Sequence, residues 1–182
     1  YSDGDILSWV RVGQVTHALH VASGLSIVNN VNGAFIFEPA ANTNAWVDVV
    51  NKSIETYNVT GADTISYSDV ENAITGNQAL FASEVLDVLE RMKDADISVG
   101  LVPNPMFTDS QENYAHYVDN HFCTYQVPIS VPDPEVIATF FELYTCHSSY
   151  TVRPAYIESY KVEYLGDDES GEMLDLIFDN LN

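Results

Sequence analysis

An extended run, a helical stretch and a second extended run follow one another between residues 78 and 102. The sequence predicts a strand from Gln78 to Ala82, a helix capped by Ser83, and a buried strand from Ile97 to Val102. Strands and helices that alternate in this order form an α/β layer with both strands in one sheet. We therefore expect an α/β fold, with Ser83 and Glu84 at the carboxyl end of the first strand, where such folds commonly bind ligands.

Two prolines, Pro103 and Pro105, follow the second predicted strand. Proline fixes φ and has no backbone N–H, so it suits the end of a strand that must stop pairing. After Pro105 the composition changes to polar and aromatic residues. We interpret Pro103, Asn104 and Pro105 as the point at which the chain leaves the predicted sheet.

The N-terminal part adds two helices and a hairpin. Apolar residues at helical spacing predict a helix over residues 12–23. Asn32 and Gly33 favour a tight turn between two extended runs, which predicts a β-hairpin closed by Pro39. A second helix starts near Asn44, and its apolar stripe is expected to pack into the core. The stripe consists of Trp46, Val47, Val50, Ile54 and Tyr57.

Capping signals predict the remaining helices. Ser68 and Glu71 have the spacing of a capping box, at the start of a short helix that ends at Gly76. Asp133 followed by proline predicts another helix start, and two further helices follow Pro154 and the acidic residues after Gly166. The side chains expected to face inward from these last three helices are Val136, Ile137, Phe140, Phe141, Leu143, Ile157, Tyr160, Val162, Tyr164, Met173, Leu174, Ile177 and Phe178.

The charge of the chain argues against two classes of partner. Acidic residues number 27 against 6 lysines and arginines, which gives a formal net charge of -21. A negative field of this size repels phosphate backbones and anionic lipid head groups, so we expect no nucleic-acid binding and no direct membrane binding. The sequence also has no run of about 18 apolar residues that would cross a bilayer.

Known catalytic and metal-binding patterns are missing from the sequence. It has no Gly-x-Ser-x-Gly elbow, no phosphate loop and no dinucleotide fingerprint. His17 and His20 are three positions apart, but a metal site needs convergent ligands, and SDGD at residues 2–5 lacks the later ligands of a calcium loop. Cys123 and Cys146 could pair in an oxidising compartment or stay free. We therefore predict no catalytic activity, no metal and no cofactor.

Four stretches in the second half of the chain carry a family resemblance. They are AITGNQALFASEVLDVLERMKDADISVGLVPNP, SQENYAHYV, VPISVPDPEVIATFFE and VRPAYIESYKVEYLGDDESGEMLDLIFDN. Their order and spacing resemble the extracellular solute-binding proteins of bacterial ABC importers, in particular the sugar-binding lipoproteins of Gram-positive gut bacteria. The resemblance covers residues 68–180 and rests on the combination, since no single motif is diagnostic.

The resemblance implies part of a two-lobed, periplasmic-binding-protein-like fold that is helix-rich with short sheets. Residues 1–102 would belong to the second, C-terminal lobe and residues 124–182 to the first, N-terminal lobe. Residues 103–123 would form the crossover and cleft, with the Pro103–Pro105 segment as the hinge. The family's signal peptide, lipid-attachment cysteine and first half-lobe have no counterpart here, so we expect an internal fragment of a longer protein.

The resemblance also implies a ligand site. Clefts that bind sugars place aromatic rings against the C–H face of the sugar and polar groups against its hydroxyls. Rings in turn-rich parts of the chain are available for this purpose, and Ser83 and Glu84 would supply polar groups. The expected ligand-binding residues are Trp9, Ser83, Glu84, Tyr114, Tyr117 and Phe122.

The expected function is the capture of a small solute, preferably a sugar or oligosaccharide, outside the cell. A monomer would deliver it to ABC permease subunits and would reach the membrane only through a lipid anchor that this chain lacks. One alternative is a secreted carbohydrate-active enzyme, which would need two carboxylates at a fixed separation. The other is a structural or adhesive cell-surface domain without a small ligand.

Overall fold

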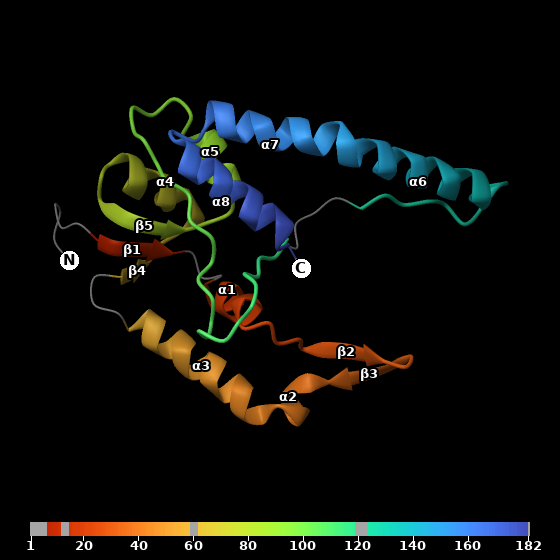
Figure 1. The fold of residues 1–182 in the computed structure, drawn as a ribbon, viewed down its shortest axis with the longest axis horizontal. Coiled ribbons are helices and arrows are strands. Elements are labelled where there is room, and N and C mark those ends of the chain that lie inside the picture. The colour runs from red at the N-terminus through yellow and green to blue at the C-terminus, as the bar shows by residue number, and fades with distance from the viewer. Residues whose placement is uncertain (1–6, 12–14, 59–61, 119–123, 182) are drawn as a thin grey trace.

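The computed structural model describes residues 7–11, 15–58, 62–118 and 124–181 and combines helices with two small sheets (Figure 1), in agreement with the α/β class. The strands are β1 (Leu7–Arg11), β2 (Val28–Val31), β3 (Ala34–Phe37), β4 (Ala62–Thr64) and β5 (Ala79–Ser83). The helices are α1 (Val15–Ala22), α2 (Glu38–Ala41), α3 (Thr43–Tyr57), α4 (Tyr67–Thr75), α5 (Asp87–Arg91), α6 (Pro134–Tyr150), α7 (Val152–Glu163) and α8 (Asp168–Asp179).

A parallel sheet of three strands, in the order β4-β1-β5, organises the fold. The chain leaves β1, passes through α1, the hairpin, α2 and α3, and adds β4 on one side. It then returns through α4 to add β5 on the other side of β1. Figure 1 shows α4 and α3 on opposite sides of this sheet. Because the strands are parallel, they end at one edge, and the strand order reverses beside β1.

The predicted strand at Gln78–Ala82 is confirmed as β5, but the segment from Ile97 to Val102 is not a strand. Ile97, Val99 and Leu101 are half-buried and pack against the core. The backbone N–H of Leu101 donates a hydrogen bond of 2.9 Å to Ser170 Oγ. The apolar alternation is therefore real, but β5 pairs with β1 instead of this segment.

One hydrophobic core joins residues from both ends of the chain. Val10 of β1, Val70 of α4 and Leu174 of α8 are each 0% exposed and belong to a single cluster. α7 and α8 therefore lie in the same body as the parallel sheet. The boundary predicted at residue 103 therefore does not separate two hydrophobic cores. The expectation that residues 124–182 lie in another lobe is corrected for α7 and α8, which share this core with the sheet.

Two predicted helix starts are confirmed by their caps. Asp133 accepts hydrogen bonds from the backbone N–H groups of Glu135 (3.2 Å) and Val136 (3.3 Å) at the start of α6. Asp167 accepts one of 2.7 Å from Ser170 N at the start of α8. In each case an aspartate satisfies N–H groups that have no partner within the helix.

Two other predicted caps are wrong. Ser66, not Ser68, occupies the N-cap position of α4, and its hydroxyl donates to Asp69 Oδ2 at 2.5 Å. Ser83 is the last residue of β5, whereas α5 begins only at Asp87. A serine followed by an acidic residue suits either a cap or a strand end, and pairing with β1 selects the strand.

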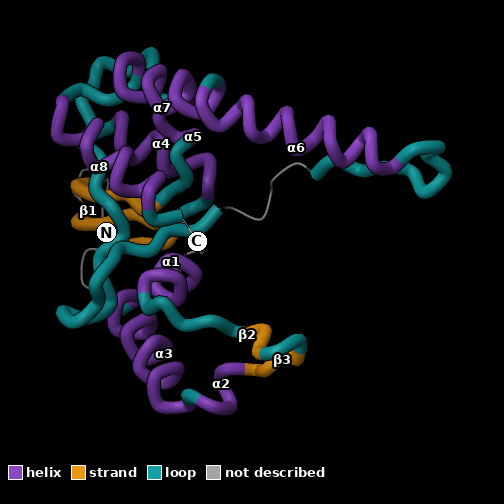
Figure 2. Tube along the Cα trace, turned by 45° about the vertical axis from the view of Figure 1, so that its right-hand side comes forward, coloured by secondary structure: helices purple, strands orange, loops and turns teal. Residues whose placement is uncertain are grey.

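The β2–β3 hairpin and α6 extend from the sheet toward the same side of the molecule (Figures 1 and 2). The hairpin confirms the prediction at Asn32 (φ 54°) and Gly33 (φ 86°), because left-handed φ values suit asparagine and glycine in tight turns. Its apolar side chains face solvent, with Phe35 77% exposed and Phe37 60% exposed.

Two apolar stripes that were predicted to be buried are exposed instead. On α3 the buried residues are Val49 and Ser53, while Trp46 and Tyr57 are half-buried. On α6 no residue is buried. Helical spacing shows which face is apolar but not whether another element covers it. The exposed members of the predicted inward set are Val47, Val50, Ile54, Val136, Phe140, Leu143 and Val162.

Candidate functional site

Trp9 and Ser83 meet at the carboxyl edge of the parallel sheet. Trp9 Nε1 donates a hydrogen bond of 3.0 Å to Ser83 Oγ. In the register of the two strands, Trp9 lies opposite Phe81 and the last residue of β1 lies opposite Ser83. Because side chains alternate along a strand, Trp9, Phe81 and Ser83 share the face of the sheet opposite to the buried Val10.

This edge combines an aromatic surface with hydroxyl and carboxylate groups. Trp9, Ser83 and Glu84 are half-buried, and Phe81 is 62% exposed. Glu84 Oε1 accepts a hydrogen bond of 2.8 Å from Val85 N, which holds the carboxylate beside the end of β5. Such groups match the two faces of a sugar, since rings contact its C–H groups and polar atoms bind its hydroxyls.

Phe81 was not among the predicted site residues. It belongs to the apolar run ALFAS, which is typical of a buried strand, and only the strand order reveals that β5 is an edge strand. One signal in the sequence could have pointed to Phe81. It lies two positions before Ser83, a predicted site residue, and residues i and i+2 of a strand share a face.

The predicted rings Tyr114 and Tyr117 lie on a different segment of the chain. Both are half-buried, and the residues between them are buried. His116 N donates a hydrogen bond of 3.0 Å to Asn180 O, and His116 forms an isolated bridge with Leu181. Figures 1 and 2 place this segment on the side of the sheet at which β1 and β5 end. The predicted Phe122 lies outside the described residues.

The predicted hinge lies in an irregular segment. Pro103 and Asn104 are half-buried and Pro105 is exposed, and none of the three belongs to a helix or strand. The sequence prediction that the chain stops pairing here agrees with this backbone. A hinge motion at these residues stays a prediction.

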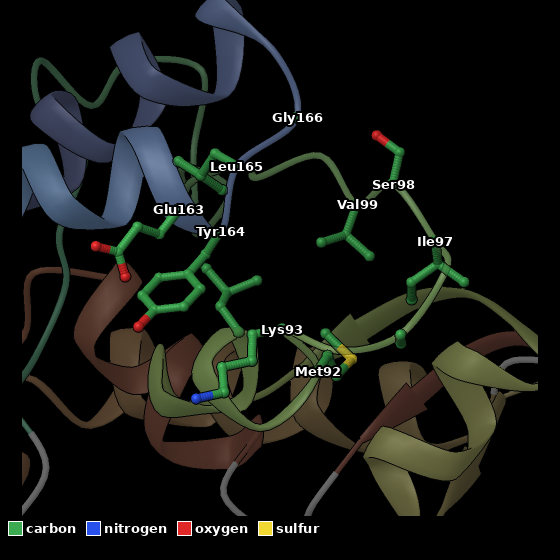
Figure 3. Close-up of a pocket in the computed structure, with 11 residues that line it drawn as sticks. Met92, Lys93, Ile97, Ser98, Val99, Glu163, Tyr164, Leu165 and Gly166 are labelled. Carbon is green, nitrogen blue, oxygen red and sulfur yellow. The ribbon is translucent and has the colours of Figure 1, made fainter.

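A cavity of about 250 Å³ lies on another part of the molecule (Figure 3). Its walls come from the end of α5, the segment after it, and the turn between α7 and α8. Gly166 lies close to Ser98 in this turn, since a Cβ atom there would lie 2.5 Å from Ser98 Oγ and the hydroxyl would have to rotate away. The lining residues are Leu89, Met92, Lys93, Ala95, Ile97, Ser98, Val99, Glu163, Tyr164, Leu165 and Gly166.

Core side chains and polar groups both line the cavity, and its exposed lining is more polar than apolar. Leu89, Met92 and Leu165 are buried and form part of the hydrophobic core. Figure 3 shows the ends of Lys93, Glu163 and Tyr164 pointing to the same side. Burial, followed by the negative charge of Glu163, raises the pKa of Tyr164, so its hydroxyl stays protonated as a hydrogen-bond donor.

The cavity could not have been found from the sequence. Lys93 and Glu163 are 70 positions apart; Lys93 lies in the turn after α5 and Glu163 is the last residue of α7. Only the packing of the α7–α8 turn against the segment after α5 brings them to one cavity.

The histidines and acidic residues of the described ranges do not form a metal site: no group of three or more His, Cys, Asp or Glu is placed to hold an ion. His20 instead packs against Trp46, with ring centroids 4.7 Å apart. Cys146 is a free, exposed thiol on α6, and Cys123 lies outside the described residues. Among the described helices, none has the length and apolar character to cross a membrane.

Comparison with models of protein families, with curated proteins and with solved structures found no match to this chain. The resemblance to solute-binding proteins of ABC importers therefore stays a prediction. Support for a function comes from the geometry of the carboxyl edge.

Proposed function

We propose that this chain is a non-enzymatic binding protein that holds a small carbohydrate at the carboxyl edge of the β4-β1-β5 sheet. The observation that carries the proposal is the hydrogen bond between Trp9 Nε1 and Ser83 Oγ. It fixes an indole ring and a hydroxyl where parallel strands end and the strand order reverses, which is a common ligand position in α/β folds.

The side chains at this edge suit a neutral polyol. Trp9 and Phe81 offer ring surface to the C–H groups of a sugar, and Ser83 and Glu84 offer hydrogen-bond partners to its hydroxyls. A neutral carbohydrate carries no charge, so the net charge of -21 does not oppose its approach. An anionic solute would meet that repulsion.

In the proposed physiological role, the protein works outside the cell and delivers its solute to an ABC permease. The parallel sheet with α4, α5, α7 and α8 would form one lobe, and a second lobe would close over the carboxyl edge. Closure would follow from the additional contacts that a bound solute makes in the closed state. The exposed apolar side chains of α6 and of the hairpin would provide surface for the contact between lobes.

A thermal-shift screen with neutral mono- and oligosaccharides tests the proposal, because a ligand that binds only the folded state raises Tm. We expect one class of sugar to raise the Tm of the wild type and to lose this effect in Trp9→Ala. The matched control is Trp46→Phe, which changes the other tryptophan and should keep the shift. Hydrolysis of the sugars, followed in the same samples, would instead favour a carbohydrate-active enzyme.

A second candidate function is a structural or adhesive module without a small ligand. It is favoured by the exposed apolar side chains of two projecting elements, such as Phe35 (77% exposed) on the hairpin and Leu143 (65% exposed) on α6. The same screen separates the two functions, because this candidate predicts no shift in Tm with any of the sugars.

A further inference from the structure

We propose that α6 is a dimerisation helix, which pairs in antiparallel orientation with α6 of a second copy of this chain. The pairing surface is a row of exposed side chains along the helix, which we call the α6 stripe. Its members are Val136, Phe140, Leu143, His147 and Tyr150. The stripe is separate from the carboxyl edge, so the proposal does not depend on carbohydrate binding. It leaves the hairpin available for the contact between lobes, but it departs from the monomer expected from the family resemblance.

The spacing of the α6 stripe is that of a coiled coil. Successive members are four, three, four and three positions apart, as are the a and d positions that form the seam between two paired helices. The valine, phenylalanine, leucine and tyrosine of the stripe are each between 58% and 65% exposed. Both acidic residues of α6, Glu135 and Glu142, occupy the c position outside the seam. The stripe is therefore apolar and carries no carboxylate.

A neighbouring flank of α6 is already covered by the chain itself. The ring centroid of Tyr125 lies 5.0 Å from that of Phe141 and 6.2 Å from that of Tyr144. Ile137 and Phe141 on this flank are half-buried. The stripe has no such cover, and a helix of 17 residues without tertiary packing is only marginally stable in water. A partner on the stripe would stabilise the helix.

A second copy fits the α6 stripe because the stripe is arranged symmetrically about Leu143. In an antiparallel pair centred on this residue, Leu143 meets the partner's Leu143. Phe140 then meets the partner's His147, ring against ring. Val136 meets the partner's Tyr150, so a small side chain faces a large one, as close packing requires. The same surface on both copies is thus self-complementary, which is the condition for a two-fold dimer.

The distribution of charge favours the antiparallel orientation. α6 carries 2 of the 27 acidic residues, so most of the net charge of -21 lies elsewhere in the chain. Figures 1 and 2 show the first turn of α6 farthest from the sheet and its last turn next to α7. Antiparallel pairing therefore places the two acidic bodies at opposite ends of about 25 Å of helix, well beyond the Debye length of about 8 Å. Parallel pairing would bring these bodies together and align the two helix dipoles.

The size of the α6 stripe fits a weak dimer. At the exposures given above, each member leaves roughly 100 Å² of open surface. Pairing of two stripes would then bury roughly 1,000 Å² in total, which is at the lower end of specific interfaces. We therefore expect a dissociation constant of about 10 µM, with monomers at low concentration and dimers at high concentration.

Analytical ultracentrifugation of the full chain tests the proposal. The weight-average mass should rise from that of one copy at about 1 µM to nearly that of two copies at about 300 µM. It should not rise beyond two copies, because an antiparallel pair uses both stripes and leaves none open.

Variants locate the interface on the α6 stripe. Phe140→Glu and Leu143→Glu each place a carboxylate in the seam, and each should weaken dimerisation at least about tenfold. The matched control is Ala138→Glu, which adds the same charge at an exposed f position on the opposite face of α6 and should leave dimerisation unchanged. Glutamate is a good helix former, so circular dichroism of the three variants at low concentration should show the same helix content.

Thiol crosslinking determines the orientation of the two helices. In a background with Cys123→Ser and Cys146→Ser, a short crosslinker should join two copies of Leu143→Cys, because this position meets itself on the two-fold axis. Tyr150→Cys alone should not crosslink, since its two copies lie about 20 Å apart along an antiparallel pair. A mixture of Val136→Cys and Tyr150→Cys should crosslink, because these two positions face each other.

Three results would overturn this proposal: the mass of one copy at every concentration, equal dimerisation of Leu143→Glu and Ala138→Glu, or crosslinking of Tyr150→Cys as efficient as that of Leu143→Cys. A chain that stays monomeric would assign the stripe to a second lobe or to a different protein instead. Failure here leaves the carbohydrate site untouched, because that site is tested with sugars and with Trp9.

Discussion

The backbone N–H of Leu101 donates a hydrogen bond of 2.9 Å to the hydroxyl of Ser170, 69 positions further along the chain. The same hydroxyl donates to Asp167 Oδ2 at 2.8 Å, and Ser170 is only 3% exposed. One buried serine therefore joins the segment after α5 to the first turn of α8. This link replaces the strand pairing that the sequence predicted for Leu101.

Ser170→Ala should lower the free energy of unfolding by about 1–3 kcal/mol, because it leaves Leu101 N–H without its partner. Ser170→Ala should also increase the rate of amide hydrogen exchange at Leu101, and this increase should be larger than at unrelated loop amides. Urea unfolding and exchange measured by NMR check both effects. Ser149→Ala, which removes an exposed hydroxyl from α6, is the control and should change stability by less than about 0.5 kcal/mol. Equal effects of the two substitutions would show that the Leu101 bond contributes nothing.

Leu174→Ala should lower the free energy of unfolding by about 2–5 kcal/mol, because Leu174 is fully buried in the shared core. In a Trp46→Phe background, the loss of helix measured by circular dichroism and the change in emission from Trp9 in β1 should occur together as one transition. Val162→Ala on α7, 72% exposed, is the control and should cost less than about 0.5 kcal/mol. A separate, earlier loss of helix with unchanged Trp9 emission would mean that α8 belongs to another cooperative unit.

Asp167 should contribute to acid sensitivity. Hydrogen bonds from Ser170 N and then Ser170 Oγ lower the pKa of Asp167 below its usual value of 3.8. A lowered carboxyl pKa adds stability above the unfolded pKa, and this stability is lost as the pH falls below about 4. Asp167→Asn keeps an acceptor for Ser170 N but does not titrate. Its urea midpoint should therefore fall less than that of the wild type between about pH 5 and pH 2, whereas Asp109→Asn, at an exposed loop residue, should follow the wild type.

His116 should make the protein less stable in mild acid. Its side chain is 6% exposed, its Nε2 has no partner among the described residues, and burial lowers its pKa from 6.5. The neutral form is therefore favoured in the folded state, so its stability contribution is present above about pH 6.5 and is lost as the pH falls. His116→Gln should show a smaller loss of stability than the wild type between about pH 7 and pH 5. His147→Gln, on the exposed α6, should behave like the wild type; the account fails if His116→Gln does so too.

Structural features that depend on interactions within a few residues were predicted correctly from the sequence. Asp133 and Asp167 mark helix starts because a side-chain oxygen reaches N–H groups two or three residues away. Asn32 and Gly33 mark the hairpin because they accept left-handed φ values. Neither feature depends on distant parts of the chain.

Features that depend on distant contacts were not predictable in the same way. Ile97, Val99 and Leu101 alternate as in a strand, yet the partner of Leu101 is a side chain on α8. The apolar spacing of α6 predicts a face, but nothing in the spacing shows whether that face is covered. The spacing of apolar residues shows which side chains are favoured to be buried. Contacts with distant parts of the chain determine which of them are buried.

For the candidate site, sequence reasoning selected Trp9, Ser83 and Glu84, and the structure brings the first two into contact. It missed Phe81, because an edge strand and a buried strand have the same apolar run. Tyr114 and Tyr117 were chosen for their irregular surroundings, and they lie on a separate segment attached to the end of α8.

The most direct test of carbohydrate binding at the carboxyl edge follows the indole N–H of Trp9 by NMR. Trp46→Phe leaves Trp9 as the single tryptophan of the 2 in the sequence, so one indole resonance remains to be followed during titration with neutral sugars. We expect one class of sugar to shift this resonance saturably and to do so more weakly after Ser83→Ala. An indole resonance that stays in place with every sugar would contradict the account.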